Sequence, residues 1–235
     1  MRLLISFSFT FLFFSCTWQQ QTVHFFKLPS FVLADTIVQA NRFLTHTEQY
    51  SDYPIYYKGI KHDTVNIGEA YSNDGIKEKP DFSRLKLFSE KLLKIQVDTT
   101  IHTSSSREYF SDNYEQLDST VYFSSRLLMI ENICDTTLLL GRTAALYNLR
   151  REIQIKDGTW ISIDSNTSEE EFCMTGKSWI ILHPGEIIIA KAKKYTGDYL
   201  GKFRFTLEYK GTVAYSNTFY DHIDRRIIED RLSKN

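Results

Sequence analysis

Apolar and polar side chains alternate in short runs through the C-terminal part of the chain, from residue 147 to residue 223. The clearest example surrounds Asp157-Gly158, with alternation on both sides of the dipeptide. This pattern predicts a β-hairpin, because Asp and Gly tolerate the positive φ angles of a type I′ turn. Trp160 then lies on the face opposite to the apolar residues. The residues expected on the buried face are Ile153, Ile155, Ile161 and Ile163.

Similar runs follow the hairpin. Residues 179–182 are apolar, and residues 187–192 begin with apolar residues on both faces, as in a central strand. Residues 183–186, His-Pro-Gly-Glu, have the composition of a β-turn. From the alternation we expect Ile161 and Phe205 to be buried, and Lys202 and Glu208 to be exposed. Short strands at this spacing predict an all-β sandwich or barrel.

Two segments nearer the N-terminus carry helix signals. Residues 31–44 have apolar positions at helical spacing, but the β-branched run Thr36-Ile37-Val38 favours a strand, so the segment is ambiguous. Asp81 is placed to cap a helix that extends to Lys91. We therefore expect one or two short helices beside the strands.

The layout of residues 53–68 returns in residues 125–141, with two apolar runs around a polar turn. Either the chain contains two related sandwich halves, or two edge hairpins resemble each other by chance. The Ser/Thr-rich residues 99–106 are predicted to be a linker. The expected division is a signal peptide at 1–15, a tether and β-containing region at 16–100 (a possible related half-domain), a β-sandwich at 107–225 and a short charged tail at 226–235.

The N-terminus has the features of an export signal. Arg2 is followed by an apolar run, residues 3–14, that is too short to span a bilayer and ends at Ser15-Cys16. An apolar run before a small residue and Cys resembles a bacterial lipoprotein signal, in which cleavage precedes Cys and the thiol is acylated. Phe13 and Phe14 depart from the strict form of that signal. The alternative is a plain secretory peptide or an uncleaved anchor.

The C-terminal strands carry a set of loose motifs: Trp160, Cys173, residues 182–186, residues 195–197, residues 202–204, residues 215–217, Phe219 and Ile223. In these positions the chain resembles a group of Bacteroidota-type lipoproteins with an immunoglobulin-like C-terminal β-sandwich. The resemblance covers about the last third of the chain. It implies an all-β, immunoglobulin-like antiparallel sandwich that is held at the cell envelope by a lipid on Cys16. That group has no established activity to carry over.

Charge and composition narrow the classes of function. The net charge is −1, and the 28 basic residues are scattered along the chain. A nucleic-acid-binding protein usually carries a basic patch or stripe, so we expect no nucleic-acid partner. Aromatic residues make up 14% of the chain, as suits strands. Some of them, such as Trp160, Trp179, Tyr195 and Tyr199, either fill the core or form a stacking platform for a sugar or a peptide.

Few residues suggest reactive chemistry. No pair of histidines has the spacing of a zinc site, and no nucleophile elbow or phosphate-binding loop is present, so we expect no catalytic residues, metal or cofactor. Glu169, Glu170, Glu171 and His183 are weak candidates for a hydrolase site. Cys134 and Cys173 are able to form a disulfide in an oxidising compartment, or to remain as buried thiols.

Asp followed by Ser or Thr, and then by an aliphatic residue, Met or Thr, occurs five times where about one occurrence is expected by chance. The triplet resembles the O-glycosylation acceptor of Bacteroidota-type envelope proteins. The acceptors would be Thr36, Thr64, Thr99, Ser119 and Thr136. The competing interpretation is that these Asp residues form side-chain turns before strands.

The sequence thus favours a lipid-anchored cell-envelope protein that acts as a non-enzymatic binding or structural module. Its sandwich loops would contact an envelope protein or a glycan. One alternative is an envelope hydrolase whose site is built from scattered residues. Another is a proteinase-inhibitor-like sandwich, because residues 182–186 also resemble that group.

Overall fold

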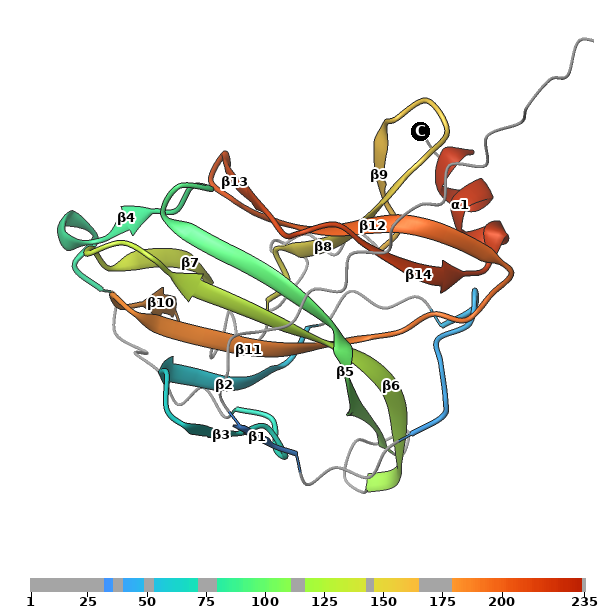
Figure 1. Cartoon of the computed structure of the whole chain (residues 1–235), viewed down its shortest axis with the longest axis horizontal. Helices are drawn as coiled ribbons and strands as arrows, with labels where there is room; N and C mark the ends of the chain where they lie inside the picture. Colours follow the sequence, from blue (N-terminus) through green and yellow to red (C-terminus); the bar gives the residue numbers. More distant parts are fainter. Residues whose placement is uncertain are drawn as a thin grey trace, which may run out of the picture.

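The structure is a computed structural model that describes residues 32–35, 40–48, 53–71, 80–110, 117–142, 146–164 and 179–233. These residues form an all-β, sandwich-type fold with one short α-helix (Figure 1). The strands are β1 (Val32–Ala34), β2 (Ile55–Ile60), β3 (Thr64–Asn66), β4 (Lys86–Leu87), β5 (Leu93–Phe110), β6 (Leu117–Asn132), β7 (Leu138–Arg142), β8 (Leu149–Gln154), β9 (Trp160–Ser162), β10 (Trp179–Leu182), β11 (Glu186–Lys193), β12 (Tyr199–Tyr209), β13 (Thr212–Tyr215) and β14 (Phe219–Ile223). The helices are the 3-10 turn η1 (Phe82–Arg84) and α1 (Arg225–Leu232).

Two antiparallel sheets face each other (Figure 1). One has the order β2-β11-β6-β5, and the other has the order β13-β12-β8-β9 with β14 also paired to β12. A smaller sheet, β10-β7-β4, and the parallel pair β1-β3 complete the described sheets. The predicted all-β sandwich class is therefore confirmed.

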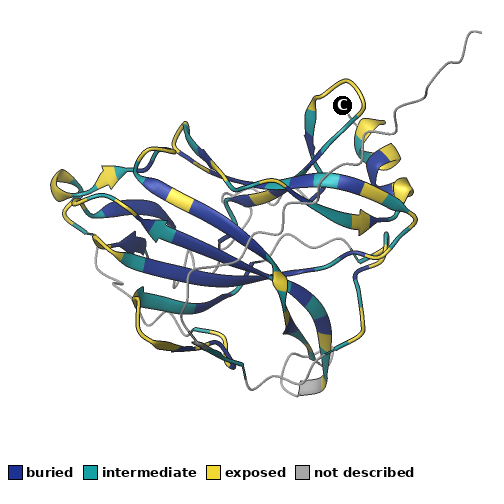
Figure 2. Ribbon diagram, viewed as in Figure 1, coloured by how far each residue is buried: buried dark blue, intermediate teal, exposed yellow. Residues whose placement is uncertain are grey.

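The main core lies between the two large sheets, where buried side chains from both meet (Figure 2). Ile188 and Phe205, which belong to different sheets, are each fully buried. A second cluster on the other face of β11 contains Ile187 and Ile189. The β11 strand is thus apolar on both faces because it is covered on both, as its sequence predicts.

The burial predictions for the C-terminal strands are largely confirmed. Ile161 is 9% exposed and Phe205 is 0% exposed, and Glu208 is exposed. Lys202 is half-buried rather than fully exposed. Trp160 lies half-buried on the face opposite to Ile161, as the alternation requires.

The hairpin around Asp157-Gly158 forms between β8 and β9, but its turn is not type I′. Only Gly158 has a positive φ, +89°, and its N–H donates to Ile155 O at 3.0 Å. This is a type I turn closed by a left-handed glycine. The type I′ turn lies instead at Lys210-Gly211, between β12 and β13, where both residues have positive φ.

The linker prediction for residues 99–106 is wrong, because this segment lies inside β5 and pairs with β6. Thr103, Ser104 and Ser105 are buried, and their hydroxyls form hydrogen bonds with other segments, as in the 2.7 Å contact between the hydroxyls of Ser105 and Ser125. A bulge at Asp98 bends the strand, and Asp98 Oδ1 accepts from the N–H groups of Thr100 and Ile101. Strands from both sides of the predicted boundary share one sheet.

The repeated layout does not produce two hairpins. β2 pairs with β11 and β3 pairs with β1, while β6 and β7 also belong to different sheets. The helix from Asp81 is shorter than expected, since Asp81 caps only η1 before β4 begins. Val32–Ala34 is a strand rather than the start of a helix. Conversely, α1 occupies most of the expected charged tail.

Candidate functional site

A groove of about 580 Å³ lies between α1, the β8–β9 turn and the start of β12. We call it the α1 groove. Its apolar side chains are Ile155, Tyr199, Ile228 and Leu232, and its charged side chains are Lys156, Asp157, Arg225 and Glu229. Ile155 and Tyr199 pack against the main core, so the groove opens onto one end of the sandwich.

Local sequence explains how α1 forms one wall of this groove. Asp224 caps the helix by accepting from the Arg226 N–H at 2.9 Å, and this hydrogen bonding with Arg226 lowers the Asp224 pKa to about 2. Ile227 is fully buried and Ile228 is 8% exposed, which fixes the helix against the core. Leu232 remains 48% exposed at the far end.

The rim of the groove carries charges of both signs. Lys156 and Asp157 come from the type I turn between β8 and β9 and are exposed. The Arg225 guanidinium belongs to α1, and it lies 5.6 Å from the centre of the Tyr199 ring at the start of β12. A site with an apolar floor and a balanced rim is suited to an amphipathic ligand rather than to a polyanion.

A second surface feature is a stack of side chains on the outer face of the five-stranded sheet. The Arg204 guanidinium lies between the rings of Trp160 and Tyr215, at 4.4 Å and 3.9 Å from their centres. Arg204 Nε also donates to Glu152 Oε2 at 2.6 Å. Because both rings already contact the guanidinium, this stack stabilises the outer face of the sheet.

The interior holds a charged network that the sequence did not reveal. Tyr53 OH and the Arg151 N–H both donate to Asp164 Oδ2, each at 2.5 Å. Burial raises the pKa of Asp164, and burial with the Asp164 charge raises that of Tyr53. Arg151 Nη2 donates to Lys193 O at 2.7 Å. The side chains of Tyr53, Arg151 and Asp164 are all buried. The network therefore stabilises the contact between distant segments and is not accessible to a substrate.

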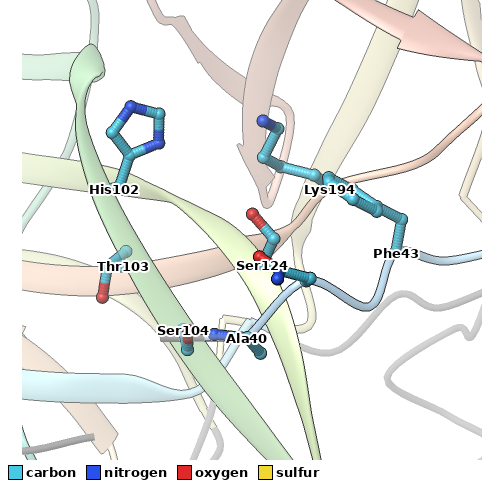
Figure 3. Close-up of a pocket in the computed structure, with 8 residues that line it drawn as sticks. Ala40, Phe43, His102, Thr103, Ser104, Ser124 and Lys194 are labelled. Carbon is cyan, nitrogen blue, oxygen red and sulfur yellow. Dashed lines mark hydrogen bonds between the residues drawn. The ribbon is translucent and has the colours of Figure 1, made fainter. Parts of the chain in front are cut away.

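A smaller polar pocket of about 200 Å³ lies where residues 40–43 pass β5 and β6. Figure 3 shows His102 on one side, Lys194 on the other and the Ser124 side chain between them. Thr103 and Ser104 of β5 complete the polar lining. No acidic side chain is among the described residues that line this pocket.

The predicted modification sites are partly outside the described residues. Cys16, Thr36 and Cys173 all lie there, so the lipid attachment and the Cys134–Cys173 disulfide stay predictions. The Cys134 thiol is half-buried and contacts Asn132 Oδ1 at 3.0 Å.

The remaining glycosylation candidates differ in exposure. Thr64, Ser119 and Thr136 are exposed, whereas the Thr99 hydroxyl is buried without a hydrogen-bond partner among the described residues. Asp98 forms a side-chain turn, because its carboxylate accepts from the N–H groups of Thr100 and Ile101, but this turn lies at a bulge inside β5 rather than before a strand. Glycosylation of the exposed positions stays a prediction.

The weak hydrolase candidates are not brought into a site by the described residues. His183 is exposed in the β10–β11 turn, with Nδ1 3.2 Å from Thr137 Oγ1, and residues 169–171 are outside the described part. Within that described part, no group of three His, Cys, Asp or Glu side chains is arranged to hold a metal ion. Among the predicted stacking residues, Tyr195 is core and Trp179 packs edge-on against Phe82.

Sequence reasoning missed most of the α1 groove. The sequence predicts Tyr199 as a stacking residue, but it places Arg225 at the end of the sandwich and Leu232 in the tail. The available signal was Asp224 before Arg225, followed by Ile227 and Ile228, which is a helix cap before an apolar pair.

Comparisons of the chain with protein-family models, with curated proteins and with solved structures gave no match. The fold and sites therefore rest on the residues themselves. None of the described helices has the length and apolar character needed to cross a bilayer.

Proposed function

We propose that this protein is a lipid-anchored module of a bacterial cell envelope that binds a protein partner through the α1 groove, without enzymatic activity. The observation that supports this most directly is the groove itself. Its volume of about 580 Å³ lies within the range of about 300–1,000 Å³ that is usual for ligand sites. Binding a partner does not require a cluster of catalytic side chains.

The lining suggests the kind of partner. Tyr199 and Ile228 offer apolar surface that continues into the core, and Leu232 extends it outward. Charged side chains of both signs line this surface, so an extended peptide segment with one apolar anchor and charged neighbours would match it. A nucleic acid or a strongly acidic glycan would meet Asp157 and Glu229 unfavourably.

The lipid at Cys16 would supply the location. In this proposal the segment between Cys16 and β1 acts as a tether that lets the sandwich meet partners near the membrane. A module held at the surface gains effective concentration for membrane-bound partners, so a modest groove is sufficient.

Site-specific photo-crosslinking in intact cells tests this function. A crosslinking amino acid at Lys156, on the rim, is expected to capture one discrete envelope protein, whereas the same amino acid at the exposed Lys94 of β5 is not. Tyr199→Ala removes the aromatic floor and should lower the yield at Lys156 about tenfold. The matched variant Tyr122→Ala, at an exposed tyrosine of β6, should leave it unchanged.

Equal capture from Lys156 and Lys94 would contradict the proposal. So would a capture at Lys156 that survives Tyr199→Ala in a variant with an unchanged melting temperature.

A further inference from the structure

The polar pocket of Figure 3 is lined by Lys194, whose backbone is held in place. The Lys194 N–H donates to Ser124 O at 2.8 Å, and Lys194 O accepts from the Leu44 N–H at 2.8 Å. Backbone hydrogen bonds therefore hold Lys194 on both sides. Its Nζ also lies 5.3 Å from the centre of the Phe43 ring, which restricts the side chain further.

The neighbouring acids are already engaged with other cations. Asp221 pairs with Arg126 at 3.1 Å, and Asp35 pairs with Lys191 at 3.1 Å. Lys194 forms neither a hydrogen bond from Nζ nor an ion pair with any described residue. Burial, and then the charge of Arg126, lower the pKa of Lys194, while Asp221 acts in the opposite direction. An anion beside Nζ would stabilise the charged form of Lys194 and offset the effect of burial.

Several neutral donors share the pocket with Lys194. The Ser124 hydroxyl, the His102 ring and the Asn41 amide line it and have no hydrogen-bond partner among the described residues. The Ser104 hydroxyl accepts from the Ala40 N–H at 2.8 Å, which leaves its own proton able to donate. A lysine surrounded by hydroxyl and amide donors is the chemistry that recognises an oxyanion.

We propose that this pocket binds a phosphate-type oxyanion, with Lys194 as the charged contact and Ser124 as a hydrogen-bond donor. The pocket volume of about 200 Å³ equals the volume that roughly seven water molecules occupy in liquid water. That is room for one phosphate and a small attached group, but not for a nucleotide. Free phosphate, a sugar or glycerol phosphate, and a phospholipid headgroup share this chemistry, and the inference is independent of the α1 groove.

Calorimetric titration of the full-length protein, purified in neutral detergent, provides the test. The probes are inorganic phosphate, glycerol 3-phosphate and phosphatidylglycerol vesicles, each at constant ionic strength. Saturable binding of at least one probe is expected, and the preferred probe identifies the source of the phosphate. Lys194→Met should weaken that binding by about tenfold or more, and Ser124→Ala by less. Lys202→Met, on the other sheet, should not change it.

A second measurement does not depend on the folding of any variant. Bound phosphate should slow the acetylation of Lys194 in the wild-type protein, followed by peptide mass spectrometry, and should leave the acetylation of Lys202 unchanged. Absence of saturable binding by all three probes would overturn the proposal. Equal protection of both lysines, or undiminished binding by a folded Lys194→Met protein, would also overturn it.

Discussion

At the scale of single residues, Lys191 shows how this fold accommodates charge inside a sheet. Its side chain is 0% exposed in the centre of β11, and the ammonium contacts the Asp35 carboxylate and donates to Ser104 O at 2.9 Å. The Tyr56 ring lies 4.2 Å from Nζ. Through Asp35, this one buried cation fixes the segment that contains β1 to the four-stranded sheet.

Removing the carboxylate should destabilise the protein more than removing the ammonium. Asp35→Asn leaves a buried cation without its counter-charge and should cost about 3 kcal/mol of unfolding free energy. Lys191→Met leaves Asp35, which is 20% exposed and still accepts from Thr103, so its cost should be smaller. Urea unfolding of both variants at pH 7 measures the order, and the reverse order would contradict this account.

The same lysine predicts a pH dependence. Burial lowers the pKa of Lys191 in the folded protein, so between that pKa and the ordinary value of 10.5 the unfolded chain binds more protons. Its contribution therefore makes stability rise as pH increases through this window. The rise should disappear in Lys191→Met. The measurement is the unfolding free energy of the wild type minus that of the variant, followed from pH 7 to pH 10. Parallel profiles would show that the lysine is not the source.

At the scale of elements, the position of α1 depends on a close backbone contact. A Cβ atom added at Gly197 would lie 2.1 Å from Asp224 N and 2.1 Å from Ile223 C. These are backbone atoms at the junction of β14 and α1, which cannot rotate away as a side chain can. The turn before β12 thus sets where the helix begins.

Gly197→Ala should therefore cost at least about 2 kcal/mol of unfolding free energy. Displacement of α1 should also reduce any binding in the α1 groove. The exposed neighbour provides a control, since Thr196→Ala should change stability by no more than about 0.5 kcal/mol. Thermal and urea unfolding measure both variants, and a Gly197→Ala protein as stable as Thr196→Ala would refute the contact.

At the scale of the whole molecule, local patterns predict the C-terminal strands and the β8–β9 hairpin, but not the other strand pairings. The alternation around Phe205 reveals one buried face, because the side-chain period of a strand is visible in a few residues. The linker prediction for residues 99–106 is wrong because a strand rich in Ser and Thr has the composition of a loop, and the buried hydroxyls of Thr103, Ser104 and Ser105 have partners that are distant in the sequence. Ile155, Tyr199 and Ile228 meet in the α1 groove although they are far apart in the sequence, so no local pattern connects them.

The proposed lipid attachment at Cys16 concerns the location of the whole molecule. Cys16→Ser should release the protein from the membrane fraction or leave its precursor uncleaved, because acylation requires the thiol. Cys134→Ser serves as the control and should fractionate like the wild type. Cell fractionation with immunoblotting gives the answer. A Cys16→Ser protein with wild-type migration and location would exclude the lipid anchor.

The order of strands along the chain has a consequence for biosynthesis. The strand at the centre of each large sheet is a late one, since β11 pairs with both β2 and β6, and β12 pairs with β8, β13 and β14. An emerging chain therefore exposes the partners of β11 and β12 until its last quarter has been synthesised. Neither sheet closes early during translation. Both sheets are completed only after the final strands have been synthesised, and if the chain is exported as proposed, this order would help to keep it unfolded until it has crossed the membrane.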